Sequence, residues 1–185
     1  IMFLLTGFSQ GITAGFSILI SQRYGAKDEN GVKRAVANGI FLSIFFTLLL
    51  TFSCLFLMKL LLTVMNTPEN IFADGQLYLK IYVYGITFLL LYNVCTGIFT
   101  ALGDSKTPLY FLIGSSVGNI ILDYYFVACM GLGVAGVAWA TFIAQGISAI
   151  LALTFLAIRL KKINCQGTFK WLDLVLLAQI AAIAI

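Results

Sequence analysis

One acidic side chain, Asp123, lies inside a long apolar stretch of the sequence, residues 108–127. An aspartate at the centre of a membrane span costs roughly 2.5–3.5 kcal/mol on the insertion scale, so such a residue is kept for function more often than for structure. Asn119 lies four residues earlier and therefore on the same face of a helix. A carboxylate and an amide oxygen on one helix face can hold a proton or a hard cation such as Na⁺.

The composition around Asp123 is that of a membrane protein. Hydrophobic residues make up 61% of the 185 residues and charged residues only 10%, against about 25% charged residues in a soluble domain. Each apolar run is close to the ~20 residues that a bilayer core requires; the runs cover about residues 1–21, 37–58, 77–101, 108–127 and 134–158. A sixth run begins at Trp171. We predict an all-α membrane protein, a polytopic helix bundle with five complete transmembrane helices and a partial sixth, and expect the chain to open inside one span and close inside another.

Several classes of function are disfavoured by the residues that the sequence lacks. The sequence has no histidine, and its four cysteines are scattered without metal-ligand spacing. No glycine-rich phosphate loop follows a strand pattern, and no catalytic triad can be assembled. The basic residues flank apolar runs, so nucleic-acid binding is not needed to explain the net charge of +4. We therefore expect neither an enzyme nor a bound cofactor.

Positive charge alternates between successive connections. It concentrates in loops 22–36, 102–107 and 159–170, whereas the intervening connections, 59–76 and 128–133, carry little. Basic loops stay on the cytoplasmic side of a membrane. We expect these three loops to be cytoplasmic and the protein to be a multi-pass protein of the cell's inner (plasma) membrane.

Polar and small residues follow one face of several predicted spans at helical spacing. The candidate cavity-lining residues are Gln10 in the first span, Ser115 in the fourth and Gln145 in the fifth; Asn93 lies on the stripe of the third. Two interpretations stay open for the glutamines, because a polar side chain can line a wet cavity or join two helices. Serine and threonine often only bond to their own helix, and the Gly114/Gly118 pair is typical of close helix packing.

Thr141 is the second candidate partner of Asp123. The fourth and fifth spans are antiparallel and joined by a short turn at residues 131–133. With a rise of about 1.5 Å per residue, Asp123, Asn119 and Thr141 fall at similar depth on adjacent helices. Together they offer a carboxylate, an amide oxygen and a hydroxyl, a set suited to Na⁺ or to a proton on the carboxylate.

Four motifs, in order along the chain, resemble the MATE (multidrug and toxic compound extrusion) transporters. They are SQRYGAKD at 21–28, GDSKTP at 103–108, GNIILD at 118–123 and GVAGVAWAT at 133–141. The resemblance implies a fold of two six-helix lobes. Residues 1–158 would hold helices two to six of the N-terminal lobe, 159–170 the cytoplasmic inter-lobe loop and 171–185 the start of helix seven.

The resemblance also implies a cation site in this lobe. The matching positions are Asp123, Asn119 and Thr141, where Na⁺ would bind, with Asn93 close by. The family's helix-one aspartate would lie before Ile1. The implied function is secondary-active export of amphipathic or cationic organic compounds in exchange for Na⁺ or H⁺, by a protein that is monomeric in the lipid bilayer.

Three alternatives stay open, of which the first is still a transporter and the other two belong to different classes. A lipid-linked oligosaccharide flippase of the same superfamily would line its cavity with basic residues, and none lies in the middle of a span here. A membrane-embedded enzyme would need a second acid, base or metal ligand beside Asp123. A non-transporting scaffold would need no buried acid at all.

Overall fold

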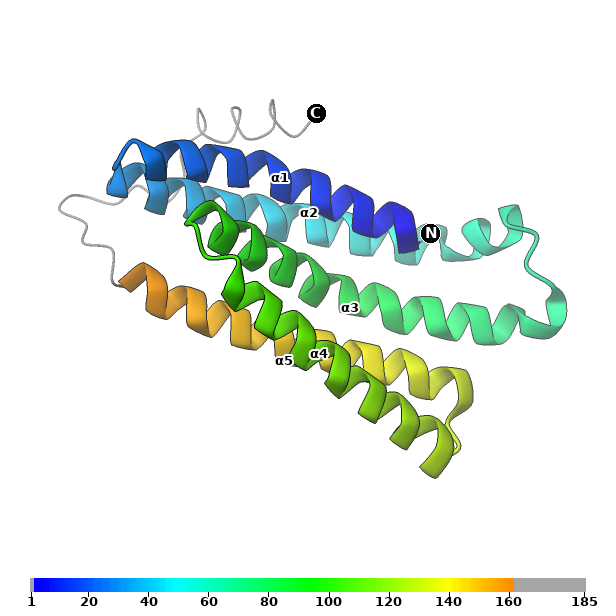
Figure 1. The fold of residues 1–185 in the computed structure, drawn as a ribbon. Helices are drawn as coiled ribbons and strands as arrows, with labels where there is room; N and C mark the ends of the chain where they lie inside the picture. Colours follow the sequence, from blue (N-terminus) through cyan, green and yellow to red (C-terminus); the bar gives the residue numbers. More distant parts are fainter. Residues whose placement is uncertain (1, 162–185) are drawn as a thin grey trace.

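The computed structural model describes residues 2–161, and of residues 2–5, 8, 9 and 12 the backbone alone. In this part of the chain the fold is a bundle of long helices that run antiparallel to their neighbours in sequence (Figure 1). The helices are α1 (Met2–Gly25), α2 (Glu29–Val64), α3 (Glu69–Ala101), α4 (Lys106–Tyr124) and α5 (Gly133–Lys161), with a π-helix, η1 (Tyr125–Cys129), continuing α4. The predicted all-α architecture is confirmed for these residues.

Four of the described helical segments are long and apolar enough to cross a membrane. They are α2, α3, α4 together with η1 (Lys106–Cys129), and α5. The first predicted span forms α1, which is not among the four, and several of its side chains lie outside the description. The partial sixth span predicted from Trp171 onward also lies outside the described residues.

Three helices begin earlier than the apolar runs predict, because polar residues cap them or fill their first turns. Asp28 accepts a hydrogen bond from the Gly31 backbone N–H at 2.9 Å, so α2 begins at Glu29 rather than near residue 37. Likewise α3 begins at Glu69, which shortens the predicted connection 59–76 to residues 65–68. Hydropathy detects the segment that lipid surrounds and not the polar turns that extend a helix beyond it.

The start of α4 is set by Asp104. Its carboxylate accepts hydrogen bonds from the backbone N–H of Thr107 at 3.1 Å and from the Thr107 hydroxyl at 2.8 Å. The helix therefore begins at Lys106, and Pro108 lies within its first turn rather than at its first position. A proline is tolerated there because the first turn has no helical partner for its N–H groups.

Helix α3 lies at the centre of the bundle and contacts each of the other four helices. Glycines allow two of these approaches. A Cβ at Gly97 would collide with Ser17 and Thr13 of α1, and one at Gly85 would lie 3.3 Å from Oε1 of Gln145 on α5. The packing predicted for Gly114 and Gly118 is absent from the described structure, where no neighbouring atom lies within 4 Å of either Cβ position.

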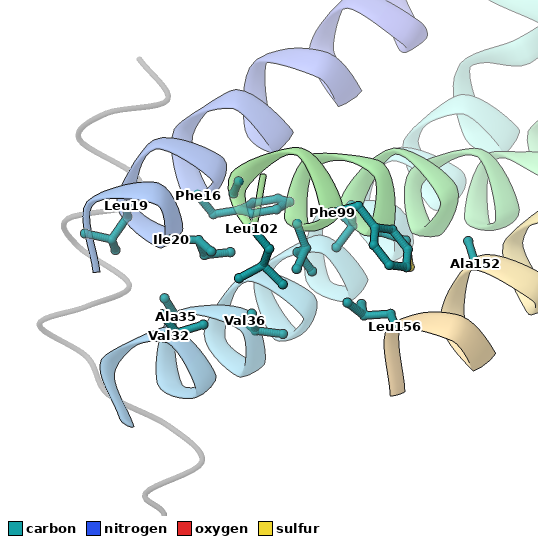
Figure 2. Close-up of a cluster of buried hydrophobic side chains, with 14 residues drawn as sticks. Phe16, Leu19, Ile20, Val32, Ala35, Val36, Phe99, Leu102, Ala152 and Leu156 are labelled. Carbon is teal, nitrogen blue, oxygen red and sulfur yellow. The ribbon is translucent and has the colours of Figure 1, made fainter. Parts of the chain in front are cut away.

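Buried side chains form two clusters along α3. The first joins α1, α2, α3 and α5 around Phe16, Ile20, Ile98 and Leu156, and Figure 2 shows part of it. The second joins the C-terminal half of α2 to the N-terminal and middle part of α3, through residues that include Met58 and Val83. Helix α4 stands apart, because Pro108 is its only fully buried residue in the described structure.

The described parts of the three basic connections lie together at one end of the bundle, which we call the basic end (Figure 1). The α1–α2 and α3–α4 turns and the last turn of α5 all lie there, and the α2–α3 and α4–α5 turns lie at the opposite end. Gly131 and Gly133 make the α4–α5 turn with φ of 65° and 53°, values that favour glycine. The described connections alternate between the two ends of the bundle as predicted, and the side of the membrane that each end faces stays a prediction.

Two aspartates at the basic end are held in their ionised form. The Gly31 backbone N–H, followed by the Arg23 guanidinium 3.1 Å away, lowers the pKa of Asp28. Hydrogen bonds from Thr107, with a smaller contribution from Arg159 at the end of α5, lower the pKa of Asp104. These carboxylates cap the N-termini of α2 and α4 at the surface, where an ionised group costs little free energy.

We expect Gly97→Ala to destabilise the protein by about 1–3 kcal/mol, the usual cost of overpacking. The added methyl would collide with Ser17 and Thr13 and push α1 away from α3. Gly75→Ala on the same helix is the matched control, because its Cβ would meet Leu62 at an ordinary 3.9 Å. Thermal unfolding of the purified full-length protein measures both variants. Equal melting temperatures for the two would show that the α1–α3 approach is not close.

We expect Asp104→Asn to be less stable than wild type at neutral pH. A carboxyl with a lowered pKa in the folded state contributes stability above its unfolded pKa and loses it as the pH falls through the folded value. The difference between the two proteins should therefore shrink as the pH falls below the ordinary aspartate pKa of about 4. Melting curves at stepped pH measure it. A difference that stayed constant down to pH 3 would mean that the Asp104 charge is not what caps α4.

Candidate functional site

Most hydroxyl groups in the polar stripes are satisfied within their own helix. Each donates to the carbonyl four residues earlier, as an isolated serine or threonine in a helix commonly does. The distances are 2.7 Å for Ser17 to Thr13, Ser43 to Gly39 and Thr47 to Ser43, and 2.8 Å for Ser148 to Ala144. The local-bonding interpretation of these hydroxyls is confirmed, and they need no ligand to explain them.

Asn119 and Asp123 differ from these hydroxyls. Nδ2 of Asn119 and Oδ1 of Asp123 are fully buried and have no hydrogen-bond partner among the described residues. A buried polar group without a partner costs several kcal/mol in an apolar medium, roughly 2–7 kcal/mol. Such groups call for a partner, whether an ion, a proton, water or another polar side chain.

The flank of α4 that carries these two residues can be placed from its contacts. Pro108 is buried, and its carbonyl accepts a hydrogen bond from the Tyr92 hydroxyl of α3 at 3.2 Å. Asn119 lies roughly three turns further along nearly the same line of the helix, and Asp123 follows one turn later. The α5-facing line is a different one, where Gly114, Ser115, Gly118 and Leu122 border a groove shared with α5. Asn119 and Asp123 therefore lie on the α3 side of that groove.

The depth of Thr141 relative to Asp123 follows from an aromatic contact. The rings of Phe111 on α4 and Phe155 on α5 are 5.3 Å apart and fix the register of the two antiparallel helices. Asp123 on α4 and Ile143 on α5 each lie twelve residues from these rings, in the direction of the α4–α5 turn. Thr141 lies two residues beyond Ile143, a difference in depth of about 3 Å.

Thr141 also lies on the side of α5 that turns toward α3 and α4. Gln145, one turn along α5, approaches Gly85 of α3, whereas Ala144 and Ser148 border the groove with α4. Thr141 lies on the helix wheel between these two directions. It is half-buried, as are Asn119 and Asp123. Helix orientation and register therefore turn Asn119, Asp123 and Thr141 toward the α3 side of the α4–α5 pair, and in the described structure no hydrogen bond joins the buried atoms of Asn119 and Asp123 to Thr141.

The remaining predicted residues have different surroundings. Asn93 is half-buried on α3 and is not without a partner. Ser115 borders the α4–α5 groove, a space of about 240 Å³. The Gln145 side chain packs against Gly85, which fits the helix-joining interpretation of this glutamine. Gln10 is exposed on α1.

Two features of the region escaped prediction. The first is Thr96 on α3, whose buried hydroxyl oxygen has no partner among the described residues. Its position between Asn93 and Thr100, one turn after Tyr92, is the sequence signal that would have predicted it as part of the polar stripe. The second is η1, which starts two residues after Asp123 and widens the turn, with Met130 N–H donating to the Tyr125 carbonyl at 3.1 Å. Single π-turns inside helices occur often at functional sites.

Residues 2–161 contain no group of three or more histidine, cysteine or acidic residues that could hold a metal ion. One carboxylate with neutral oxygen ligands suits a singly charged ion or a proton that binds and leaves.

Comparison with known proteins identifies the family of the chain. The MatE family matches residues 1–125. The chain is 36% identical over 175 residues to the probable multidrug resistance protein YoeA of Bacillus subtilis (strain 168), covering 92% of this chain and 38% of that protein. It is 32% identical over 155 residues to the probable multidrug resistance protein YpnP of the same organism, covering 84% and 35%. The chain thus spans less than two fifths of the length of these relatives.

Solved structures share the fold. A crystal structure of MATE in the bent conformation superposes with a TM-score of 0.90 at 22% identity, covering 99% of this chain and 41% of that one. An inward-facing MATE family transporter of the MOP superfamily superposes with a TM-score of 0.84 at 21% identity, covering 97% and 41%. The family match and the fold lead to one conclusion: this chain belongs to the MATE family of multi-pass membrane transporters, which are not enzymes.

Proposed function

We propose that the complete protein is a secondary-active efflux antiporter that exports amphipathic or cationic organic compounds in exchange for Na⁺ or H⁺. Membership of the MATE family and the names of the curated relatives, probable multidrug resistance proteins, support export of small molecules. The structural observation that carries the proposal is the pair of unpartnered buried atoms on Asn119 and Asp123.

Asp123 is the proposed coupling residue. Its half-buried carboxylate needs a compensating charge when ionised, and either a proton or Na⁺ supplies one. Asn119 and Thr141 would offer neutral oxygen ligands to Na⁺, and Asn93 on α3 would support them. An ion that binds one conformation of the transporter better than the other shifts the equilibrium between them. Release of that ion would then favour the conformation that takes up substrate.

The complete transporter would have two six-helix lobes, with residues 1–158 forming helices two to six of the first lobe. Residues 159–170 would connect the lobes and 171–185 would begin helix seven. The positive charge at the basic end favours a cytoplasmic location for that end. Transport would proceed by rocking of the lobes around a site near the middle of the membrane, as in other repeat-built transporters.

We expect Asp123→Asn in the full-length protein to lower ion-dependent efflux by at least about tenfold, because an amide can neither release a proton nor neutralise Na⁺. The measurement is efflux of a fluorescent cationic dye from cells under imposed Na⁺ and H⁺ gradients. Asp74→Asn is the matched control, since Asp74 is exposed near the start of α3. Surface expression of each variant is quantified alongside.

Wild-type efflux with unchanged ion dependence in Asp123→Asn would rule out this coupling role. A second variant distinguishes coupling to Na⁺ from coupling to H⁺. Thr141→Val should weaken dependence on Na⁺ and leave a purely proton-driven exchange nearly unaffected, because the hydroxyl is proposed as a ligand of the metal ion and not as the carrier of the proton.

We also expect Asn119→Leu to be as stable as wild type or more stable, because it removes a buried amide nitrogen without a described partner. Asn38→Leu is the contrasting variant. Asn38 is fully buried and its Nδ2 donates to the Arg34 carbonyl at 2.8 Å, so its replacement should cost roughly 1–3 kcal/mol. Melting temperatures of the purified full-length variants test this. A large loss of stability in Asn119→Leu would assign Asn119 a structural role.

A further inference from the structure

A second site candidate lies on the opposite flank of the bundle from Asp123, between α2 and the end of α5. It is an open groove of about 380 Å³. One stripe of α2 and a single residue of α5 line it; the residues are Lys33, Val36, Ala37, Ile40, Phe41, Ile44 and Leu160. Every lining residue except Lys33 is apolar, and Phe41 and Ile44 are about half exposed. The groove has the character of a surface that faces lipid chains.

Lys33 places a positive charge at the mouth of this groove. It lies in the second turn of α2, at the basic end of the bundle, and is half-buried. The apolar positions follow it at helical spacing toward the middle of the membrane. A lysine in this position can lay its aliphatic stem along the groove and keep its ammonium at the level of the lipid headgroups.

Three arginines near the basic end act on acidic side chains. Arg23 pairs with Asp28 at 3.1 Å, Arg34 also acts on Asp28, and Arg159 acts on Asp104. Lys33 forms no ion pair with the residues that the structure describes. Glu29, one turn earlier on α2, borders a separate hollow beside the α1–α2 turn. The ammonium of Lys33 is therefore available to an external anion.

We propose that this groove binds an anionic phospholipid, with the phosphate of the headgroup on Lys33 and an acyl chain along Val36, Ile40 and Ile44. Basic pockets between transmembrane helices at the cytoplasmic side favour anionic lipids. The apolar wall contacts any acyl chain equally well, so selectivity comes from the lysine. This site is independent of the proposed transport activity and can be tested without it.

Native mass spectrometry of the purified full-length protein, exchanged into an equimolar mixture of phosphatidylglycerol and phosphatidylcholine with identical chains, tests the proposal. We expect wild type to retain phosphatidylglycerol over phosphatidylcholine by about fivefold at one site, the size expected for one lysine at an anionic surface. Lys33→Gln should abolish that preference. Lys59→Gln, near the far end of the same helix and exposed, should keep it.

A second variant tests the groove itself. Ala37→Phe fills the space beneath Lys33 without changing the charge and should remove the retained lipid of either class. An unchanged preference for phosphatidylglycerol in Lys33→Gln would overturn the proposal. Unchanged lipid retention in Ala37→Phe would also overturn it, because the groove would then be occupied by another part of the protein. Melting temperatures close to wild type establish that each variant is folded.

Discussion

Every polar group that lies within lipid needs a partner, and this requirement organises the described part of the chain. The backbone meets it by forming helices almost without interruption, because no water is available to its N–H and C=O groups. Many serine and threonine hydroxyls meet it within one turn, as Ser43, Thr47 and Ser148 show. Buried atoms of Asn119 and Asp123 do not meet it within residues 2–161, nor do the hydroxyls of Thr51 and Thr96, and of these four residues only Asp123 carries a charge.

The position of these two residues depends on α3. Its contacts with the other four helices make it the axis of the bundle, and Gly85 and Gly97 let α5 and α1 approach it. Tyr92 and Phe99 of α3 hold the first turns of α4 through Pro108 and Phe111. Beyond those turns α4 packs mainly against α5 and makes few contacts with α3. A rigid support with one loosely covered helix suits a site whose occupant has to enter and leave.

The sequence predicted the helices, their order and the end at which the basic loops gather, because hydropathy and loop charge depend on the lipid and hardly on tertiary contacts. Helix ends were predicted less well, since Asp28 and Asp104 cap helices through polar turns that hydropathy does not detect. The contacts of individual glycines could not be predicted, because facing residues come from elsewhere in the chain. Gly97 proved to be a close contact, whereas Gly114 and Gly118 did not.

The candidate site was predictable to a similar degree. The cost of a charge in lipid marked Asp123, and helical spacing added Asn119. Thr141 followed from the short turn at 131–133 and the rise per residue, and the contact of Phe111 with Phe155 supports that register. The π-turn at Tyr125–Cys129 gave no signal in the pattern of apolar residues, because one widened turn leaves the period almost unchanged.

Asp123 is the proposed binding residue for the coupling ion. Infrared difference spectroscopy of the purified full-length protein, recorded on adding Na⁺ and on lowering the pH, reports the state of its carboxyl groups directly. We expect the wild-type difference spectrum to contain a carboxyl band that responds to at least one of the two ions. The spectrum of Asp123→Asn should lack this band. Ion-induced difference spectra that are identical in wild type and Asp123→Asn would contradict this proposal.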